Sequence, residues 1–138
     1  PEIFKAKEYL SNNDYFIPLI LVVDDSALIR KTTEKFLDNN GFRHISAKNG
    51  KEALEKLINE HVDLILLDIE MPKMNGFEFV EIIKQNAKYK DIPIIMITSR
   101  INDVHKEKAK TLGVQEYLIK PFVHQELLKN IKHYVYKR

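Results

Sequence analysis

The sequence HVDLILLDIEMPKMNG, residues 61–76, decides the fold of this chain. Its apolar run, residues 64–67, ends abruptly in Asp68 and is followed by turn residues. A run this short and rich in branched side chains predicts a central strand of a parallel sheet that is covered on both faces. Ligands of such sheets bind beyond the carboxyl ends of the strands, which is the position of Asp68. From this stretch alone, Asp68 is either a functional carboxylate or an ordinary cap of the turn.

The composition predicts one ordinary globular domain. Of the 138 residues, 44% are hydrophobic and 30% are charged, which suits a single core without disulfides or a structural metal. There is no cysteine, which excludes disulfides, thiol catalysis and cysteine metal sites. The net charge of +2 is too small to predict nucleic-acid binding, and no apolar run approaches the ~20 residues of a membrane span. We therefore expect a cytoplasmic protein, or the cytoplasmic part of one, that contacts neither nucleic acid nor membrane.

Strands and helices are predicted to alternate along the chain. Residues 1–17 are expected to form a linker or N-terminal extension, followed by one domain over residues 18–138. Apolar runs predict strands at 19–23, 42–47, 64–67, 92–97 and 114–119, each followed by a helix. Strict alternation with short loops implies right-handed crossovers and one doubly wound parallel α/β sheet.

Capping residues and apolar stripes locate the helices. Ser26 or Asp25 is expected to cap the first helix, Gly41 to follow its end, and Asn49 to cap the second helix. The predicted apolar faces are Ile29, Thr33, Phe36 and Leu37 in the first helix, and Ala53, Leu54, Leu57 and Ile58 in the second. The fourth helix, residues 103–112, has the weakest stripe, formed by His105, Ala109 and Leu112, so we expect it to be exposed and loosely held.

The ends of four predicted strands bring polar groups to one edge of the sheet. Asp24 and Asp25 follow the first strand, Asp68 the third, Thr98 the fourth and Lys120 the fifth. Adjacent strand residues point to opposite faces, so both acids of the first pair reach the site only if the strand is already turning there. Three clustered carboxylates repel one another unless a cation neutralises them, and oxygen ligands with an adjacent phosphate suit Mg²⁺. Lys120 would then act as a point charge for a phosphoryl group.

Four segments carry a resemblance to a known family. VVDDS at 22–26, DLILLDIEMPKMNG at 63–76, IIMITS at 94–99 and YLIKPF at 117–122 resemble the receiver domains of two-component response regulators, which have the CheY-like fold. The resemblance covers residues 19–136 and implies a five-stranded parallel sheet in the order 2-1-3-4-5. It also implies that Asp68 accepts a phosphoryl group from a histidine kinase or a histidine phosphotransfer domain.

The resemblance implies a role for each site residue. Asp25 and Asp68 would ligate Mg²⁺ together with the backbone carbonyl of Glu70, and Asp24 would hold the ion through water. Thr98 and Lys120 would bind the phosphoryl oxygens, and Tyr117 would be the switch aromatic. The Lys120-Pro121 peptide would be cis. The surface read by a downstream protein would be the fourth helix, the fifth strand and the fifth helix.

A narrower resemblance concerns the subfamily. The sequences DIEMP at 68–72 and MITSR at 96–100 look like the C-terminal receiver of chemotaxis-type (CheA-like) hybrid histidine kinases, including those linked to type IV pili. Ile119 stands where such hybrids commonly carry glycine. This resemblance implies a signalling role in chemotaxis or motility rather than an enzyme.

Three alternatives are weighed against a phosphoacceptor. A haloacid-dehalogenase-like phosphatase needs two acids spaced two residues apart after its first strand, whereas Asp24 and Asp25 are adjacent. A flavodoxin needs a hydroxyl-rich phosphate loop there, and this acid pair would repel the flavin phosphate. A degenerate docking receiver would have lost Asp68, Thr98 or Lys120, and all three are present.

A last expectation concerns the lifetime of the phosphoryl group. Glu70 and Arg100 each lie two residues beyond a site residue and carry opposite charges on long side chains. An ion pair between them is sterically feasible across the approach of an attacking water. We therefore expect slow self-dephosphorylation.

Overall fold

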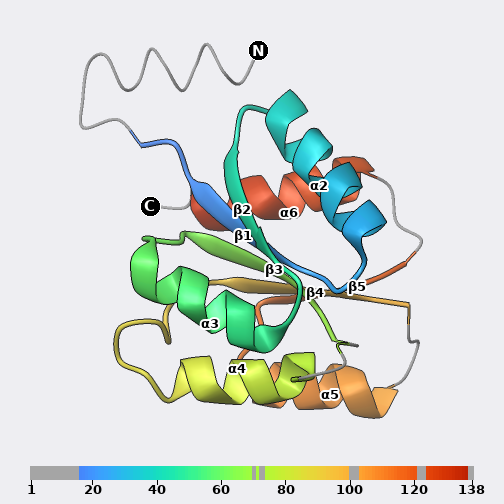
Figure 1. Cartoon of the computed structure of the whole chain (residues 1–138). Helices are drawn as coiled ribbons and strands as arrows, with labels where there is room; N and C mark the ends of the chain where they lie inside the picture. The colour runs from blue at the N-terminus through green and yellow to red at the C-terminus, as the bar shows by residue number, and fades with distance from the viewer. Residues whose placement is uncertain (1–15, 70, 72–73, 100–102, 121–123, 137–138) are drawn as a thin grey trace.

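The computed structural model describes residues 16–69, 71, 74–99, 103–120 and 124–136. The predicted alternation is confirmed, with five parallel strands and a helix after each (Figure 1). The strands are β1 (Leu19–Val23), β2 (Arg43–Ala47), β3 (Leu64–Asp68), β4 (Ile94–Thr98) and β5 (Glu116–Ile119). The helices are α2 (Ala27–Asn39), α3 (Gly50–Asn59), α4 (Gly76–Lys84), α5 (Asp103–Thr111) and α6 (His124–Val135).

The sheet has the order β2-β1-β3-β4-β5, which confirms the predicted 2-1-3-4-5 topology. Helices α2 and α6 cover one face of the sheet, and α3, α4 and α5 cover the other (Figure 1). Because β1 and β3 are central strands, their side chains are buried on both faces. Asp68 ends β3, so the fold places its carboxylate at the carboxyl edge of the middle strand of the sheet.

Alternate residues of each central strand enter two separate cores. On the side of α3 to α5, the core includes Leu21, Ile65 and Met96, together with Phe79 and Val80 from α4. On the side of α2 and α6, the core contains Ile20, Val22, Leu64, Leu66, Ile95, Leu37, Leu118, Leu127 and Ile131. The sheet is therefore held from both faces, which fixes the relative positions of the strand ends.

The predicted caps are confirmed. Ser26 caps α2 by accepting a hydrogen bond from the Ile29 N–H at 3.2 Å, and Asn49 caps α3 by accepting from the Glu52 N–H at 2.8 Å. Gly41 follows α2 with a φ of 78°, a conformation that glycine adopts without steric cost. These local signals set the helix starts that flank the carboxyl edge of the sheet.

Two residues predicted on apolar helix faces lie elsewhere. Ile58 is 67% exposed and Ile29 is 36% exposed, whereas Leu37 and Leu57 are buried. Each helix rests on the sheet through a narrow stripe, and one residue further along a helix turns the side chain by about 100°. Ile58 therefore points past the sheet instead of onto it. The prediction of a continuous apolar face was wrong at these two positions.

Helix α5 is largely exposed, as predicted. Ala109 is its only buried residue. Two ring contacts join it to α4: the His105 ring lies 5.6 Å from the Phe77 ring, and the Lys108 Nζ lies 4.9 Å from the centroid of the Phe77 ring.

Strand β5, which follows α5, is shorter than predicted, beginning at Glu116 instead of residue 114. None of the described helices is long and apolar enough to span a bilayer.

Candidate functional site

The structure brings the three predicted carboxylates together at the carboxyl edge of the sheet. Oxygen atoms of Asp24, Asp25 and Asp68 all lie within 4.8 Å of one another. Asp24 is buried, Asp68 half-buried and Asp25 exposed, so the cluster opens towards solvent on one side. The adjacent acids Asp24 and Asp25 both reach the cluster because β1 ends at Val23 and the backbone turns before α2 begins.

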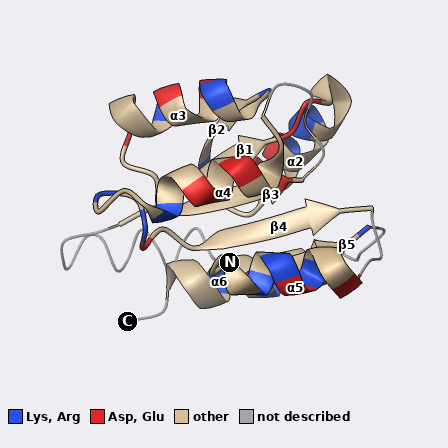
Figure 2. Cartoon of the chain, turned by 90° about the horizontal axis from the view of Figure 1, so that it is seen from below, with Lys and Arg blue, Asp and Glu red and all other residues tan. Residues whose placement is uncertain are grey.

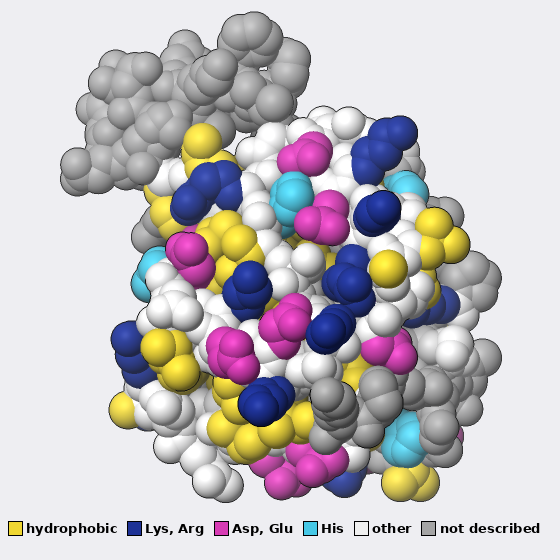
Figure 3. All heavy atoms as spheres, viewed as in Figure 1, with side chains coloured by type: hydrophobic (Ala, Val, Ile, Leu, Met, Phe, Trp, Pro, Cys, Tyr) yellow, Lys and Arg dark blue, Asp and Glu magenta, His cyan; other side chains and the backbone are white. Residues whose placement is uncertain are grey.

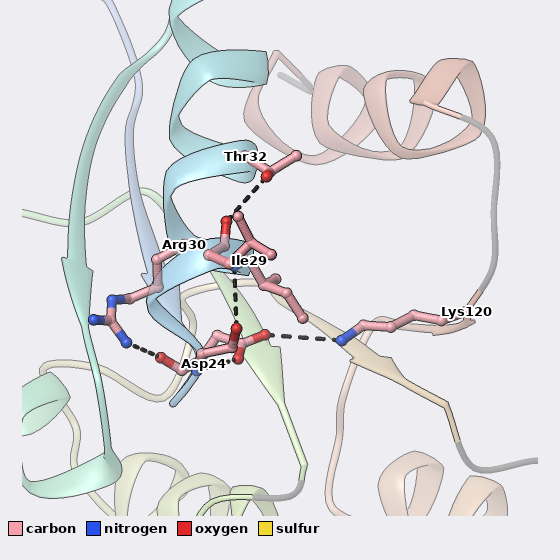
Figure 4. A network of polar contacts seen from close by, with 7 residues as sticks. Asp24, Ile29, Arg30, Thr32 and Lys120 are labelled. Carbon is pink, nitrogen blue, oxygen red and sulfur yellow. Dashed lines mark hydrogen bonds and ion pairs between the residues drawn. The ribbon is translucent and has the colours of Figure 1, made fainter.

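Asp24 is fixed by several polar contacts (Figure 4). Its Oδ1 accepts a hydrogen bond from the Ser26 N–H at 2.9 Å, and its Oδ2 lies 3.8 Å from the Lys120 Nζ. Burial raises the pKa of the Asp24 carboxyl above its usual value, while the Ser26 N–H and Lys120 act in the opposite direction. Burial thus destabilises the charged form of Asp24, and a nearby positive charge stabilises it.

Thr98 and Lys120 reach the same edge through the pairing of β4 with β5. Thr98 is fully buried at the end of β4 and pairs with Ile119, and the Lys120 N–H donates to the Thr98 carbonyl at 2.7 Å. Asp68 pairs with Ile97, the residue before Thr98. The register of three neighbouring strands therefore positions the acid, the hydroxyl and the ammonium side by side.

Tyr117 lies further back along β5. It pairs with Met96 in β4, is half-buried, and packs against the core on the side of α3 to α5. This places the predicted switch aromatic two residues before the strand-end position that pairs with Thr98.

The loop after Asp68 folds back through a glycine. The Gly76 N–H donates to the Ile69 carbonyl at 2.8 Å, and a Cβ at Gly76 would lie 2.8 Å from the Ile69 Cα and 2.9 Å from the Asp68 carbonyl oxygen. These neighbours are backbone atoms, so they cannot move aside cheaply. At Gly50 in α3, a Cβ would instead meet the Met74 side chain, with its Sδ at 2.6 Å. Sequence reasoning missed this close approach, for which the only sequence signal is the glycine itself.

Three predicted features lie outside the described residues. They are the Glu70 carbonyl, the Arg100 side chain and the Lys120-Pro121 peptide. Beside the described part of the site is a small hollow of about 50 Å³, whose lining includes Asp24, Asp68, Lys120 and Ile29. It lies between the sheet edge and α2.

A larger hollow of about 270 Å³ lies at the opposite, amino-terminal edge of the sheet. Its apolar lining includes Leu57, Val62, Tyr89 and Ile92, with Ile58 at its side. None of the predicted site residues borders it, so size alone does not identify the functional site.

Sequence reasoning missed Arg30. Its Nη1 donates to the Asp24 backbone carbonyl at 2.7 Å (Figure 4). The signal in the sequence is a basic residue within the first four residues of a helix, where the helix dipole disfavours a cation.

Charged side chains elsewhere are mixed in sign. Basic and acidic residues are interspersed along α3, α4 and α5, while β4 carries neither (Figure 2). The face seen in Figure 3 likewise mixes Lys and Arg with Asp and Glu. Within the described ranges, the group of three acidic side chains that lie close together is the carboxylate cluster at the sheet edge.

Comparison with known proteins agrees with this arrangement. The profile of the response regulator receiver domain family matches residues 20–132. Protein PilG of Pseudomonas aeruginosa is 39% identical over 116 residues, covering 84% of this chain and 86% of that protein. Sensor histidine kinase CheAY of Helicobacter pylori is 36% identical over 129 residues, covering 92% of this chain but only 16% of that protein.

Solved structures show the same fold. Chemotaxis protein CheY4 of Vibrio cholerae matches with a TM-score of 0.81 at 35% identity, covering 86% of this chain and 99% of that chain. The sheet order, the matched profile and relatives above 30% identity lead to one conclusion: the chain belongs to the CheY-like response regulator receiver domain family.

Proposed function

We propose that Asp68 takes a phosphoryl group from a phosphohistidine and that the resulting acyl phosphate switches the surface of α5, β5 and α6. A receiver is a signalling domain, and this one would act in a two-component phosphorelay. The observation that carries the proposal is the carboxylate cluster with Lys120 at the same sheet edge. A cluster that only capped loops would not need an ammonium 3.8 Å from its most buried member.

The donor set fits Mg²⁺. The three carboxylates offer oxygen atoms only, within 4.8 Å of one another, which suits a hard cation that retains water and binds phosphate. Asp25 and Asp68 would hold the ion directly with the Glu70 carbonyl, and Asp24 through water. When bound, the ion supplies positive charge that offsets the charge of the phosphoryl oxygens.

The residues of the chain then perform a simple displacement. An Asp68 carboxylate oxygen forms a bond to phosphorus while the phosphorus–nitrogen bond breaks, and the leaving imidazole takes up a proton. Lys120 and Thr98 would bind the transferred oxygens. Because the acyl phosphate carries roughly two negative charges in place of the single charge of the Asp68 carboxylate, the buried Thr98 hydroxyl would reorient toward it and Tyr117 would follow. Weak packing of α5 through Ala109 supports a nearby surface that can rearrange.

The proposed partners are a histidine kinase or a histidine phosphotransfer domain as donor and a protein as target. The match to one segment of a sensor histidine kinase supports a donor of this class, and the match to a chemotaxis protein supports an output in chemotaxis or motility. Residues 1–17 remain a proposed linker, and a cytoplasmic location without nucleic-acid or membrane contact remains part of the proposal. The mixed charges of Figures 2 and 3 favour a protein partner over nucleic acid.

Phosphorylation itself is the test of the acceptor. The chain is incubated with a small-molecule phosphoryl donor and Mg²⁺, and acyl phosphate is measured by intact mass and by its lability in hydroxylamine. Wild type should gain one phosphoryl group, whereas Asp68→Asn and Asp25→Ala should gain none. Lys31→Ala, an exposed position on α2, serves as the control. Full labelling of Asp68→Asn would place the acceptor elsewhere, and an unlabelled wild type would favour the degenerate docking alternative.

Signal transmission needs a separate test. Thr98→Ala and Lys120→Ala should still accept phosphate slowly, because Asp68 and the metal ligands remain. Neither should transmit it, so the amide chemical shifts around Tyr117 should stay close to those of the unphosphorylated chain. Shifts equal to those of phosphorylated wild type in Thr98→Ala would remove the hydroxyl from the switch.

A further inference from the structure

Arg30 holds the backbone at the point where the carboxylate cluster is built. Its Nη1 donates to the Asp24 carbonyl oxygen at 2.7 Å, a short, charge-assisted hydrogen bond. Arg30 is half-buried and begins the second turn of α2, where its own N–H donates to the Ser26 carbonyl at 2.9 Å. Figure 4 shows the side chain reaching back from the helix to the end of β1.

The carbonyl that Arg30 binds belongs to the peptide between Asp24 and Asp25. On a regular strand these neighbours would point to opposite faces of the sheet. Here their carboxylate oxygens lie within 4.8 Å of each other, so the orientation of that one peptide decides whether both reach the cluster. The peptide before it is also fixed, because the Asp24 N–H donates to the Ala47 carbonyl at 3.1 Å.

Two electrostatic effects oppose a cation at this position. The amino-terminal end of a helix disfavours positive charge, and the first turn of α2 contains no acidic residue that would balance it. A guanidinium close to a cation site also repels the cation. Helix stability therefore does not explain Arg30. Its charge is the weakest of the influences on the Asp24 pKa, whereas its side chain makes a hydrogen bond of 2.7 Å to the Asp24 carbonyl.

We propose that Arg30 is a positioning residue, which fixes the peptide between Asp24 and Asp25 so that both carboxylates face the Mg²⁺ site. The inference rests on the proposed function for the identity of the ion. The arrangement of the turn does not depend on it, because the Ser26 N–H bond to the Asp24 carboxylate reports the same geometry in metal-free protein.

The test uses the whole chain with Arg30→Met, Arg30→Lys and the matched control Lys31→Met. Lys31 is exposed on the same helix, so its replacement removes the same charge without touching Asp24. Mg²⁺ alone is titrated and followed by amide chemical shifts, in about 1 M salt, where a Debye length of about 3 Å screens charge repulsion. Hydrogen exchange of the Ser26 amide is measured without Mg²⁺.

We expect Arg30→Met to bind Mg²⁺ about 10- to 100-fold more weakly than wild type, as is usual when a group that orients a metal ligand is lost. Its Ser26 amide should exchange faster, and Lys31→Met should match wild type in both measurements. Wild-type exchange in Arg30→Met would overturn the proposal whatever the affinity, and so would an equal loss of affinity in Lys31→Met.

Two further outcomes are kept distinct. Should Arg30→Met fail to fold, Arg30→Lys carries the test, because an ammonium lacks the planar donor fork of a guanidinium. Smaller changes in the same direction are then expected, and wild-type values for both readouts would overturn the proposal. If wild type itself binds no Mg²⁺, the proposed function fails, while the Ser26 exchange still decides the role of Arg30.

Discussion

Replacing Asp24 by asparagine should make the metal-free protein more stable. Asp24 is 6% exposed and its carboxylate lies within 4.8 Å of those of Asp25 and Asp68. At that distance each repulsion is worth about 1 kcal/mol in water and about 3 kcal/mol at an effective dielectric constant of 20. Two attractions oppose these repulsions, that of Lys120 at 3.8 Å and a weaker one from Arg30. Asparagine retains the oxygen that accepts from Ser26, so we expect the free energy of unfolding to rise by about 1–2 kcal/mol.

Urea denaturation of both proteins in EDTA at pH 7 measures the difference. Burial raises the Asp24 pKa in the folded state above its ordinary value of 3.8. At a pH between the unfolded and the folded pKa, the folded state therefore holds a proton that the unfolded state has lost. The stability that wild type lacks relative to Asp24→Asn should therefore be largest above the folded pKa of Asp24. It should shrink as the pH falls through that pKa and vanish below about pH 3.8.

Mg²⁺ should reverse the order of the two proteins. An ion that binds only the folded state at 100 times its dissociation constant adds about 2.7 kcal/mol, and Asp24→Asn should gain less. The reasoning is refuted if the variant is no more stable than wild type at pH 7 without Mg²⁺. It is also refuted if the difference persists unchanged below pH 4.

Three further predictions concern stability and phosphoryl lifetime. Gly76→Ala should lower the free energy of unfolding by about 1–3 kcal/mol, because the added Cβ would meet backbone atoms. Gly50→Ala should lower it by less, because the added Cβ would meet the Met74 side chain. Urea denaturation measures both losses, and equal losses would contradict this reasoning. Tyr134→Phe should cost about 1 kcal/mol of lost hydrogen bonding. Since burial raises the Tyr134 pKa from 10.0 to about 12, the advantage of wild type should be full below pH 10 and decline towards pH 12 in the same assay. Arg100→Ala and Glu70→Asn should speed the decay of the acyl phosphate, because each removes one partner of the expected ion pair. Unchanged decay in both would show that this pair does not restrict the attacking water.

The central strands were predictable because a strand that is buried on both faces appears in the sequence as a short, unbroken apolar run. The run at residues 64–67 and the acid after it are sufficient to place Asp68 at a sheet edge. Caps such as Ser26 and Asn49 were predictable for a similar reason, since each satisfies N–H groups of its own helix three residues away.

Contacts that depend on three-dimensional placement were not predictable. Ile29 and Ile58 are apolar in sequence, but the width of the stripe that touches the sheet is set by how the helices lie on it. Arg30 reaches a carbonyl six residues earlier, a contact that depends on the angle between β1 and α2. The close approach at Gly76 depends on the path of a loop that no periodicity describes.

The single buried alanine of α5 affects how this helix moves. So little buried surface gives a low free energy of local opening, so α5 should leave its resting position spontaneously and often. The displaced arrangement would then exist as a minor population before any phosphoryl group arrives. Moving such an equilibrium from 1:99 to 99:1 takes about 5.5 kcal/mol of differential stabilisation, and a smaller initial gap requires less. Backbone amides of α5 should accordingly exchange with solvent faster than those of α4, which buries five residues against the sheet.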